Sequence, residues 1–273
     1  MNRIDALFRS TRGNGSALIG YATAGFPDRG ASLSIAAALL EQCDALELGI
    51  PFSDPVMDGP VIQESSRRAL EAGTRVRDVL DMARELRLGT GKPLLVMTYY
   101  NPVHRLGPSI FAGEAARAGV DGVLIPDLPP EEMAEWREAA GAAGLSTVLF
   151  ASMTTPEERL RHLGRLTRGF LYCIAAKGTT GLRESLAEGL NDFMERTRSC
   201  CSVPLALGIG ISNPEQCRHA AGLADAVVVG SALVKSAMQA LDEGDNPARR
   251  AAELAGRLKE AMQKRPSPSS TGD

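Results

Sequence analysis

Residues 45–60 read Ala-Leu-Glu-Leu-Gly-Ile-Pro-Phe-Ser-Asp-Pro-Val-Met-Asp-Gly-Pro. The first part is a short apolar run typical of a buried strand. It contains a carboxylate, Glu47, whose charged form is costly in apolar surroundings. Turn-forming residues follow and include a second carboxylate, Asp58. A strand and the loop after it therefore present two acids at the C-terminal end of the strand, where parallel α/β proteins place their active sites.

Both acids also have purely structural interpretations. Glu47 could be satisfied by neighbouring backbone amides, as buried polar groups usually are. Asp54 and Asp58 could be ordinary turn residues, because aspartate side chains stabilise turns by bonding to the local backbone. The residues alone leave these alternatives open.

Short apolar segments alternate with helical patterns along the chain, as in repeated βα units. Because the segments are apolar throughout, they are typical of parallel strands buried on both faces. An α/β fold, a (β/α)8 TIM barrel with an extra N-terminal helix at 2–11, is the most economical interpretation. An open doubly wound sheet is the alternative, although the first turn, Ala-Gly-Phe-Pro-Asp, lacks the usual glycine motif. The expected strands are 17–23, 45–49, 93–99, 122–126, 146–150, 169–174, 203–207 and 225–229.

Helices are expected at 32–42, 63–73, 108–118, 131–143, 156–166, 184–199 and, with interruptions, 231–263. Residues 1–263 would form one barrel domain, and barrels of this kind commonly have about 250 residues. The last ten residues, 264–273, are rich in Ser and Pro and are expected to form a disordered tail.

Composition excludes several classes of protein. The net charge of −3 gives no basic footprint for nucleic acid. The five cysteines lack a C-x-x-C spacing, which favours reduced thiols in the cytoplasm over disulfides or a zinc site. Residues 1–15 lack the apolar segment of a signal peptide, and no apolar run approaches the roughly 20 residues of a membrane helix. We therefore expect a soluble cytoplasmic protein that binds neither membranes nor nucleic acid.

Two glycine clusters follow the last two predicted strands, Gly208-Ile-Gly210 and Gly230-Ser231. Glycine lets backbone N–H groups approach phosphate oxygens closely, and a helix N-terminus adds further donors. Each cluster could also be a tight turn. Barrels commonly bind phosphate at these two loops, so together the clusters predict a small phosphorylated ligand.

The stretch 46–60 resembles the signature L-E-L-G-[VI]-P-[FY]-S-D-P, followed by D-G-P, of the tryptophan synthase alpha chain family, and the resemblance extends along almost the whole chain. It implies the retro-aldol cleavage of indole-3-glycerol phosphate to indole and glyceraldehyde 3-phosphate, without a metal or organic cofactor. Glu47 would transfer protons and Asp58 would stabilise the charge on the indole ring. The resemblance also assigns Tyr172, Thr180 and Gly181 to the substrate site, and Tyr21, Ile125 and Leu207 are candidate apolar walls.

The resemblance further implies a partner, the beta chain, in an alpha2beta2 tetramer. Asp54 and Pro55 lie in the loop that would contact it. The loop at 175–181 keeps the family's final Thr-Gly but departs from its usual pattern before it, which affects the expected closure of that loop. The histidines, His104, His162 and His219, match no family catalytic position, and we interpret them as structural or surface residues.

Three other functions are compatible with these residues. The chain could act as a freestanding lyase that releases indole for secondary metabolism. It could be a Schiff-base aldolase that uses Lys177, which follows the sixth predicted strand, because a desolvated lysine can be nucleophilic. It could also be a catalytically silent subunit that only regulates a partner, although the presence of both Glu47 and Asp58 argues against this.

Overall fold

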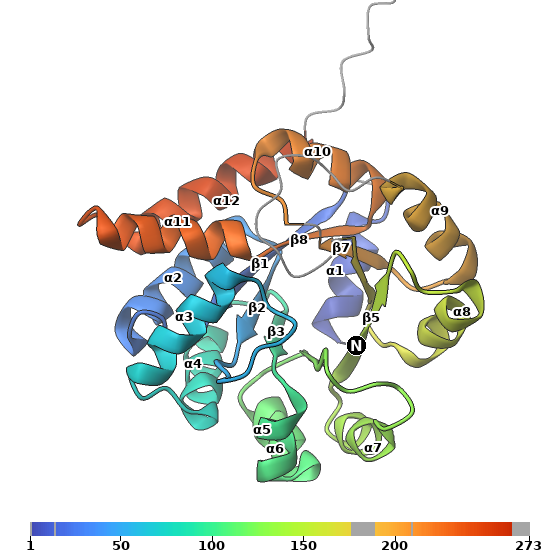
Figure 1. Cartoon of the computed structure of the whole chain (residues 1–273), viewed down its shortest axis with the longest axis horizontal. Coiled ribbons are helices and arrows are strands. Elements are labelled where there is room, and N and C mark those ends of the chain that lie inside the picture. The colour runs from blue at the N-terminus through green and yellow to red at the C-terminus, as the bar shows by residue number, and fades with distance from the viewer. Residues whose placement is uncertain (1, 14, 176–188, 209, 264–273) are drawn as a thin grey trace, which may run out of the picture.

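The computed structural model describes residues 2–13, 15–175, 189–208 and 210–263. Within these residues, eight parallel strands close into a barrel in chain order, and the last strand pairs with the first (Figure 1). The predicted barrel is confirmed, and the open sheet is wrong. The strands are β1 Ala17–Thr23, β2 Ala45–Gly49, β3 Leu94–Met97, β4 Gly122–Leu124, β5 Ser146–Ser152, β6 Leu171–Ile174, β7 Leu205–Gly208 and β8 Ala226–Val229.

Alternation along the strands divides their side chains between two cores. Ile19, Ala45 and Leu95 belong to a cluster inside the barrel, whereas their neighbours in sequence, such as Leu46, pack against the surrounding helices. Since side chains alternate along a strand, Glu47 faces the interior two residues beyond Ala45. This arrangement explains why apolar residues occupy both faces of every strand, and why a carboxylate within one of them is exceptional.

Helices surround the barrel (Figure 1). The predicted helical regions are confirmed with shifts at their ends, except that 184–188 lie outside the described residues, as does the expected tail. The helices are α1 Arg3–Thr11, α2 Arg29–Gln42, α3 Pro60–Glu71, α4 Val76–Gly89, α5 Tyr100–Leu106, α6 Pro108–Arg117, α7 Ala134–Ala142, α8 Glu157–Leu166, α9 Leu190–Cys200, α10 Pro214–Leu223, α11 Ser231–Asp242 and α12 Pro247–Gln263.

Helices α4, α5 and α10 were not predicted from the sequence. Helix α5 begins at Tyr100, where we expected only the end of a strand, and Pro102 fits because the first turn of a helix tolerates proline. Helix α10 carries clear start signals that the analysis missed. The Asn213 side chain accepts a hydrogen bond from Gln216 N, and Pro214 occupies the first helical position.

Helix α1 closes the N-terminal end of the barrel. Its Ile4 and Phe8 side chains join the interior cluster, and the Phe8 and Phe170 rings lie 5.6 Å apart. This apolar plug fills the N-terminal end of the interior, on the side away from the loops that follow the strands.

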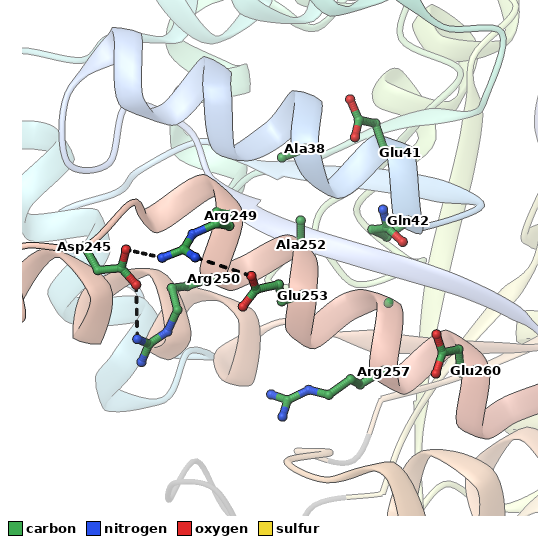
Figure 2. Close-up of a pocket in the computed structure, with 11 residues that line it drawn as sticks. Ala38, Glu41, Gln42, Asp245, Arg249, Arg250, Ala252, Glu253, Arg257 and Glu260 are labelled. Atoms are coloured by element: carbon green, nitrogen blue, oxygen red, sulfur yellow. Dashed lines mark hydrogen bonds and ion pairs between the residues drawn. The ribbon is translucent and has the colours of Figure 1, made fainter.

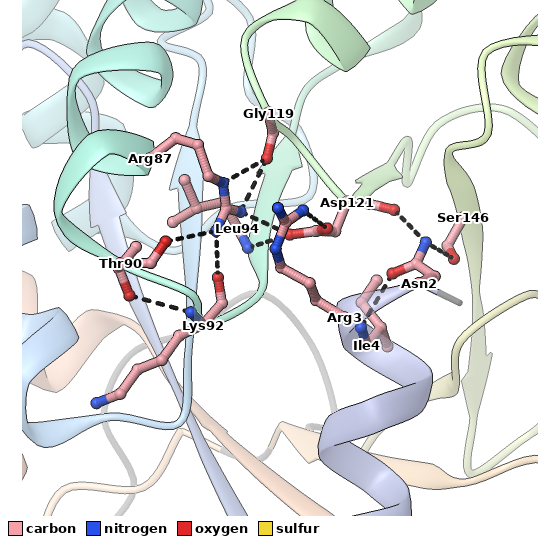
Figure 3. Close-up of polar contacts among 10 residues, drawn as sticks. All are labelled: Asn2, Arg3, Ile4, Arg87, Thr90, Lys92, Leu94, Gly119, Asp121 and Ser146. Carbon is pink, nitrogen blue, oxygen red and sulfur yellow. Dashed lines mark hydrogen bonds and ion pairs between the residues drawn. The ribbon is translucent and has the colours of Figure 1, made fainter.

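Buried Asp121 holds the same end of the barrel together (Figure 3). Its carboxylate accepts hydrogen bonds from Arg3 of α1 at 2.9 Å, from Arg87 of α4 at 2.7 Å, and from the backbone N–H of Leu94 in β3 at 2.9 Å. Its carbonyl accepts a further bond from the Asn2 side chain at 2.9 Å. Such a satisfied buried carboxylate, remote from the C-terminal ends of the strands, has a structural role.

In the described parts of the chain, no helix is long and apolar enough to cross a membrane.

Candidate active site

Glu47 is an ionisable group enclosed by the barrel. It pairs in register with Tyr21 of β1 and Leu95 of β3, and only 1% of its surface is exposed. Its Oε2 atom has no hydrogen-bond partner among the described residues. Burial, and secondarily the negative charge of Asp58, raise the pKa of Glu47 to about 8. The carboxyl is therefore protonated at neutral pH, and the backbone-satisfied alternative does not hold for Oε2.

Asp58 lies in the segment between β2 and α3. The Tyr99 hydroxyl donates to its Oδ2 atom at 3.0 Å, and its own backbone N–H donates to Pro55 O at 3.0 Å. Burial raises the pKa of Asp58 to about 6, while the hydrogen bond from Tyr99 lowers it. Asp58 is therefore mainly ionised at neutral pH, in contrast to Glu47.

Two tyrosines complete the interior of the site. Burial raises the pKa of Tyr21 and of Tyr172 well above the ordinary value, and the negative charges of Glu47 and Asp58 add to this effect on both. Both phenols therefore keep their protons at neutral pH, near enough to the two carboxyl groups to interact with their charges. Tyr172 lies within β6 rather than at its end, and its ring centroid is 5.0 Å from that of Phe150.

Small residues on neighbouring strands make room for these rings. A Cβ atom on Gly49 would lie 2.0 Å from the Tyr21 hydroxyl, and one on Gly208 would lie 2.7 Å from the Tyr172 hydroxyl. Both distances are far shorter than a van der Waals contact, so only glycine fits. Gly208, which the sequence analysis assigned to phosphate binding, thus has a packing reason of its own.

The glycine clusters after β7 and β8 lie at the predicted end of the barrel. Gly230 caps α11, which begins at Ser231, so a helix N-terminus follows β8. Gly210, two residues beyond β7, has a φ of 67°, in the left-handed region that favours glycine. Because β7 and β8 pair directly, the two loops are neighbours. The N-terminus of a helix such as α11 has backbone N–H groups without intrahelical partners, which can bind an anion.

Several predicted residues do not join this group. Thr180, Gly181 and Lys177 lie outside the described residues. Ile125 and Leu207 pack in the outer layer between strands and helices, so the structure contradicts their expected role as walls of the site. The reason is strand alternation, which turns their side chains away from the barrel axis. The histidines lie on α5, α8 and α10, outside the barrel.

The loop expected to meet a partner is exposed. Asp54 is exposed, and the Ser53 hydroxyl donates to its Oδ2 atom at 2.5 Å. Next to Pro55, the apolar side chains of Val56 and Met57 are 69% and 48% exposed. Neighbouring exposed apolar side chains at the edge of a functional site are typical of a protein interaction surface.

Tyr99 is the site residue that the sequence analysis missed. It is buried and contacts Asp58 through its hydroxyl, and its ring stacks on Phe52 with the centroids 5.0 Å apart. The available signal was its position just beyond a strand that neighbours β2, because the C-terminal ends of barrel strands carry catalytic residues.

A surface cavity of about 930 Å³ lies between α2 and α12, outside the barrel (Figure 2). Basic and acidic side chains line it together, and Arg249 forms ion pairs with Asp245 and Glu253. Four carboxylates and three arginines line the cavity, so the charges mostly compensate one another and leave a formal net charge of only −1. It contains none of the predicted site residues.

Comparisons with known proteins agree with the geometry. Residues 8–263 match the profile of the family described as tryptophan synthase alpha chain. The tryptophan synthase alpha chain of Streptomyces avermitilis is 44% identical over 229 residues, covering 84% of this chain and 83% of that relative. The Thermococcus kodakarensis relative is also 44% identical, over 88% of this chain and 96% of its own. The chain belongs to the tryptophan synthase alpha chain family.

Solved structures of this family share the fold. A tryptophan synthase structure from Mycobacterium tuberculosis superposes with a TM-score of 0.88 at 36% identity, covering 97% of this chain and 99% of that one. Tryptophan synthase subunit alpha from Legionella pneumophila gives a TM-score of 0.88 at 34% identity, covering 96% and 98%. The family resemblance noted in residues 46–60 thus extends to the whole barrel, and membership favours the main interpretation over the three alternatives.

Proposed function

We propose that this chain cleaves indole-3-glycerol phosphate to indole and glyceraldehyde 3-phosphate. The observation that carries the proposal is a pair of carboxyl groups at one end of the barrel whose pKa values are about 8 for Glu47 and about 6 for Asp58. Environments that separate the pKa values of two acids assign them different roles. At neutral pH Glu47 holds a proton and Asp58 carries a charge.

Each state suits one step of a retro-aldol cleavage. Glu47 donates its proton to indole C3, which turns the ring into an electron sink with a positive charge centred near its nitrogen. The Glu47 carboxylate then accepts the proton of the glycerol hydroxyl as the carbon–carbon bond breaks and its electrons return to the ring. The ionised Asp58 accepts a hydrogen bond from the indole N–H and stabilises the positive charge. The Glu47 proton is restored at the end, so the site is ready for another turnover.

The direct test is an assay of indole release by the purified chain, alone and with a beta chain. Indole formation that needs neither a metal nor a cofactor supports the proposal. Failure to release indole under both conditions would refute it. Borohydride trapping of substrate on Lys177 would instead support the Schiff-base aldolase, whose lysine lies outside the described residues.

We assign phosphate recognition to Gly181, Gly210, Gly230 and Ser231, with Gly208 in the same cluster as Gly210, and keep Thr180 as a residue of the substrate site. Ser231 is the first residue of α11. We expect Ser231→Asp to weaken binding of glycerol 3-phosphate about 10-fold or more, because a carboxylate there repels the phosphate. The fold should not suffer, since an acidic residue in the first turn favours the helix.

Isothermal calorimetry with glycerol 3-phosphate measures this effect. Ser34→Asp, at an exposed position on α2, is the matched control for the change in net charge. Unchanged affinity in Ser231→Asp would show that the phosphate binds elsewhere.

We also propose a beta chain as the partner, in an alpha2beta2 assembly, docked on the loop that contains Asp54 and Pro55. The exposed Val56 and Met57 side chains support this docking surface. We expect the isolated chain to be weakly active and a beta chain to stimulate it strongly. Asp54→Ala should reduce the stimulation without changing basal turnover, because a single interface contact shifts a conformational equilibrium only modestly.

Stimulation is measured by titrating each variant with the beta chain. Asp242→Ala, at the C-terminal end of α11, is a control at another exposed aspartate. If the isolated chain already turns over at about 1 per second or faster and the beta chain has no effect, the freestanding lyase is correct.

A further inference from the structure

The loop that carries Asp58 is attached to the barrel through one phenol. Tyr99 follows β3 and is 3% exposed. Its oxygen lies 3.0 Å from the backbone nitrogen of Met57 and 3.0 Å from Oδ2 of Asp58. Two successive residues of the loop therefore share one contact, with a residue just beyond a neighbouring strand.

The directions of these two bonds are determined by the donors available. A backbone N–H can only donate, so the Met57 bond uses a lone pair of the Tyr99 oxygen. The single hydroxyl proton then points to Asp58. Burial and the negative charge of Asp58 raise the pKa of Tyr99, so the phenol retains its proton across the physiological range. Tyr99 is thus a fixed donor to the carboxylate.

The ring of Tyr99 is held as firmly as its hydroxyl. It stacks on Phe52, at the start of the same loop, with an interplanar angle of 23° and a centroid distance of 5.0 Å. The strand below it is also anchored, since Ile50 N donates to Met97 O at 2.8 Å. The ring contacts one end of the loop and the hydroxyl contacts the other, so the oxygen has little freedom to move away from Asp58.

We propose that Tyr99 is a positioning residue for the reaction, which holds the Asp58 carboxylate where the indole N–H will meet it. This inference rests on the proposed cleavage of indole-3-glycerol phosphate. It assigns Tyr99 no contact with the reacting atoms, because its only hydroxyl proton is used by Asp58. Its effect on catalysis passes entirely through that carboxylate.

Tyr99→Phe is the decisive variant, because it removes the hydroxyl and keeps the ring that stacks on Phe52. We expect kcat for indole release to fall about 10- to 100-fold at neutral pH, the effect of losing a hydrogen bond to a charged group, with little change in affinity for glycerol 3-phosphate. Tyr100→Phe is the matched control, since the neighbouring phenol contacts His104 rather than Asp58.

Two further measurements separate positioning from a general loss of structure. Losing the bond that lowers the pKa of Asp58 should move the acidic limb of the pH profile of kcat/KM to higher pH. In addition, the double variant Tyr99→Phe/Asp58→Asn should be no worse than Asp58→Asn alone, because both changes remove one shared function. The other ionisable groups facing Asp58 remain in both backgrounds, namely Glu47, Tyr21 and Tyr172.

The outcomes are distinguishable from failure of the proposed function, which would appear as a wild-type protein that releases no indole. If the wild type is active, wild-type kcat in Tyr99→Phe overturns the inference. An acidic limb of the pH profile that does not shift in Tyr99→Phe also overturns the inference. The same holds if the losses in kcat of the two single variants multiply in the double variant, since Tyr99 would then act independently of Asp58.

Discussion

Replacing Glu47 by glutamine is expected to abolish indole release, with a loss of about 1000-fold or more, because the amide can neither donate a proton to C3 nor accept the hydroxyl proton. Binding of glycerol 3-phosphate should persist, since the phosphate loops lie after β7 and β8 and do not depend on this side chain. The comparison is made by indole release and by calorimetry on the same preparations. Glu41→Gln, at an exposed position on α2, is the control.

The same variant tests the state of the buried carboxyl. An unfolded chain would release the Glu47 proton near the ordinary pKa of 4.5, whereas the folded protein keeps it to about pH 8. The free energy of unfolding therefore falls as the pH rises from about 4.5 to about 8, and this loss of stability stays constant at higher pH. Glu47→Gln lacks this penalty, so we expect its Tm to exceed that of the wild type by an amount that grows from pH 4.5 to 8. A variant that melts earlier yet turns over normally would make Glu47 a structural residue.

Replacing Asp58 by asparagine is expected to reduce kcat about 100- to 1000-fold, the usual effect of removing a group that stabilises transition-state charge. An amide has nearly the same shape but carries no charge to balance the protonated ring. Stability should change little at neutral pH, because the loop keeps its backbone bonds. Substantial activity in this variant would reduce Asp58 to a turn residue.

The pH profile provides a check on Asp58. In the wild type, activity requires an ionised Asp58 and a protonated Glu47, so kcat/KM should fall below about pH 6 and above about pH 8. Asp58→Asn should lose the acidic limb and keep a basic limb that lies at lower pH, because only Glu47 still titrates and the charge of Asp58 no longer raises its pKa. A profile with both limbs unchanged would assign the acidic limb to another group.

Much of the fold could be predicted because most helices and strands have a recognisable local sequence pattern. The continuous apolar segments predicted parallel strands, and β1 and β2 have the expected bounds. The helix that begins at Ser231 after a glycine was also predicted. Helices α5 and α10 were not predicted, although a proline in the first turn of each is compatible with a helix start. The directions of Ile125 and Leu207 were missed because alternation was not followed from Leu124 and Ala206, which face the interior.

The amino-acid sequence alone determined three things: the parallel barrel, the family, and the unusual carboxylate within an apolar strand. These depend on pattern and on residue type. Only the tertiary structure could assign the states of the two acids. The pKa of Glu47 rises because the closed barrel removes water from it, and that of Asp58 is held lower by the hydroxyl of Tyr99, 41 residues away in sequence. Desolvation and a hydrogen bond between two loops arise only when distant segments pack together, so the local sequence pattern cannot predict them.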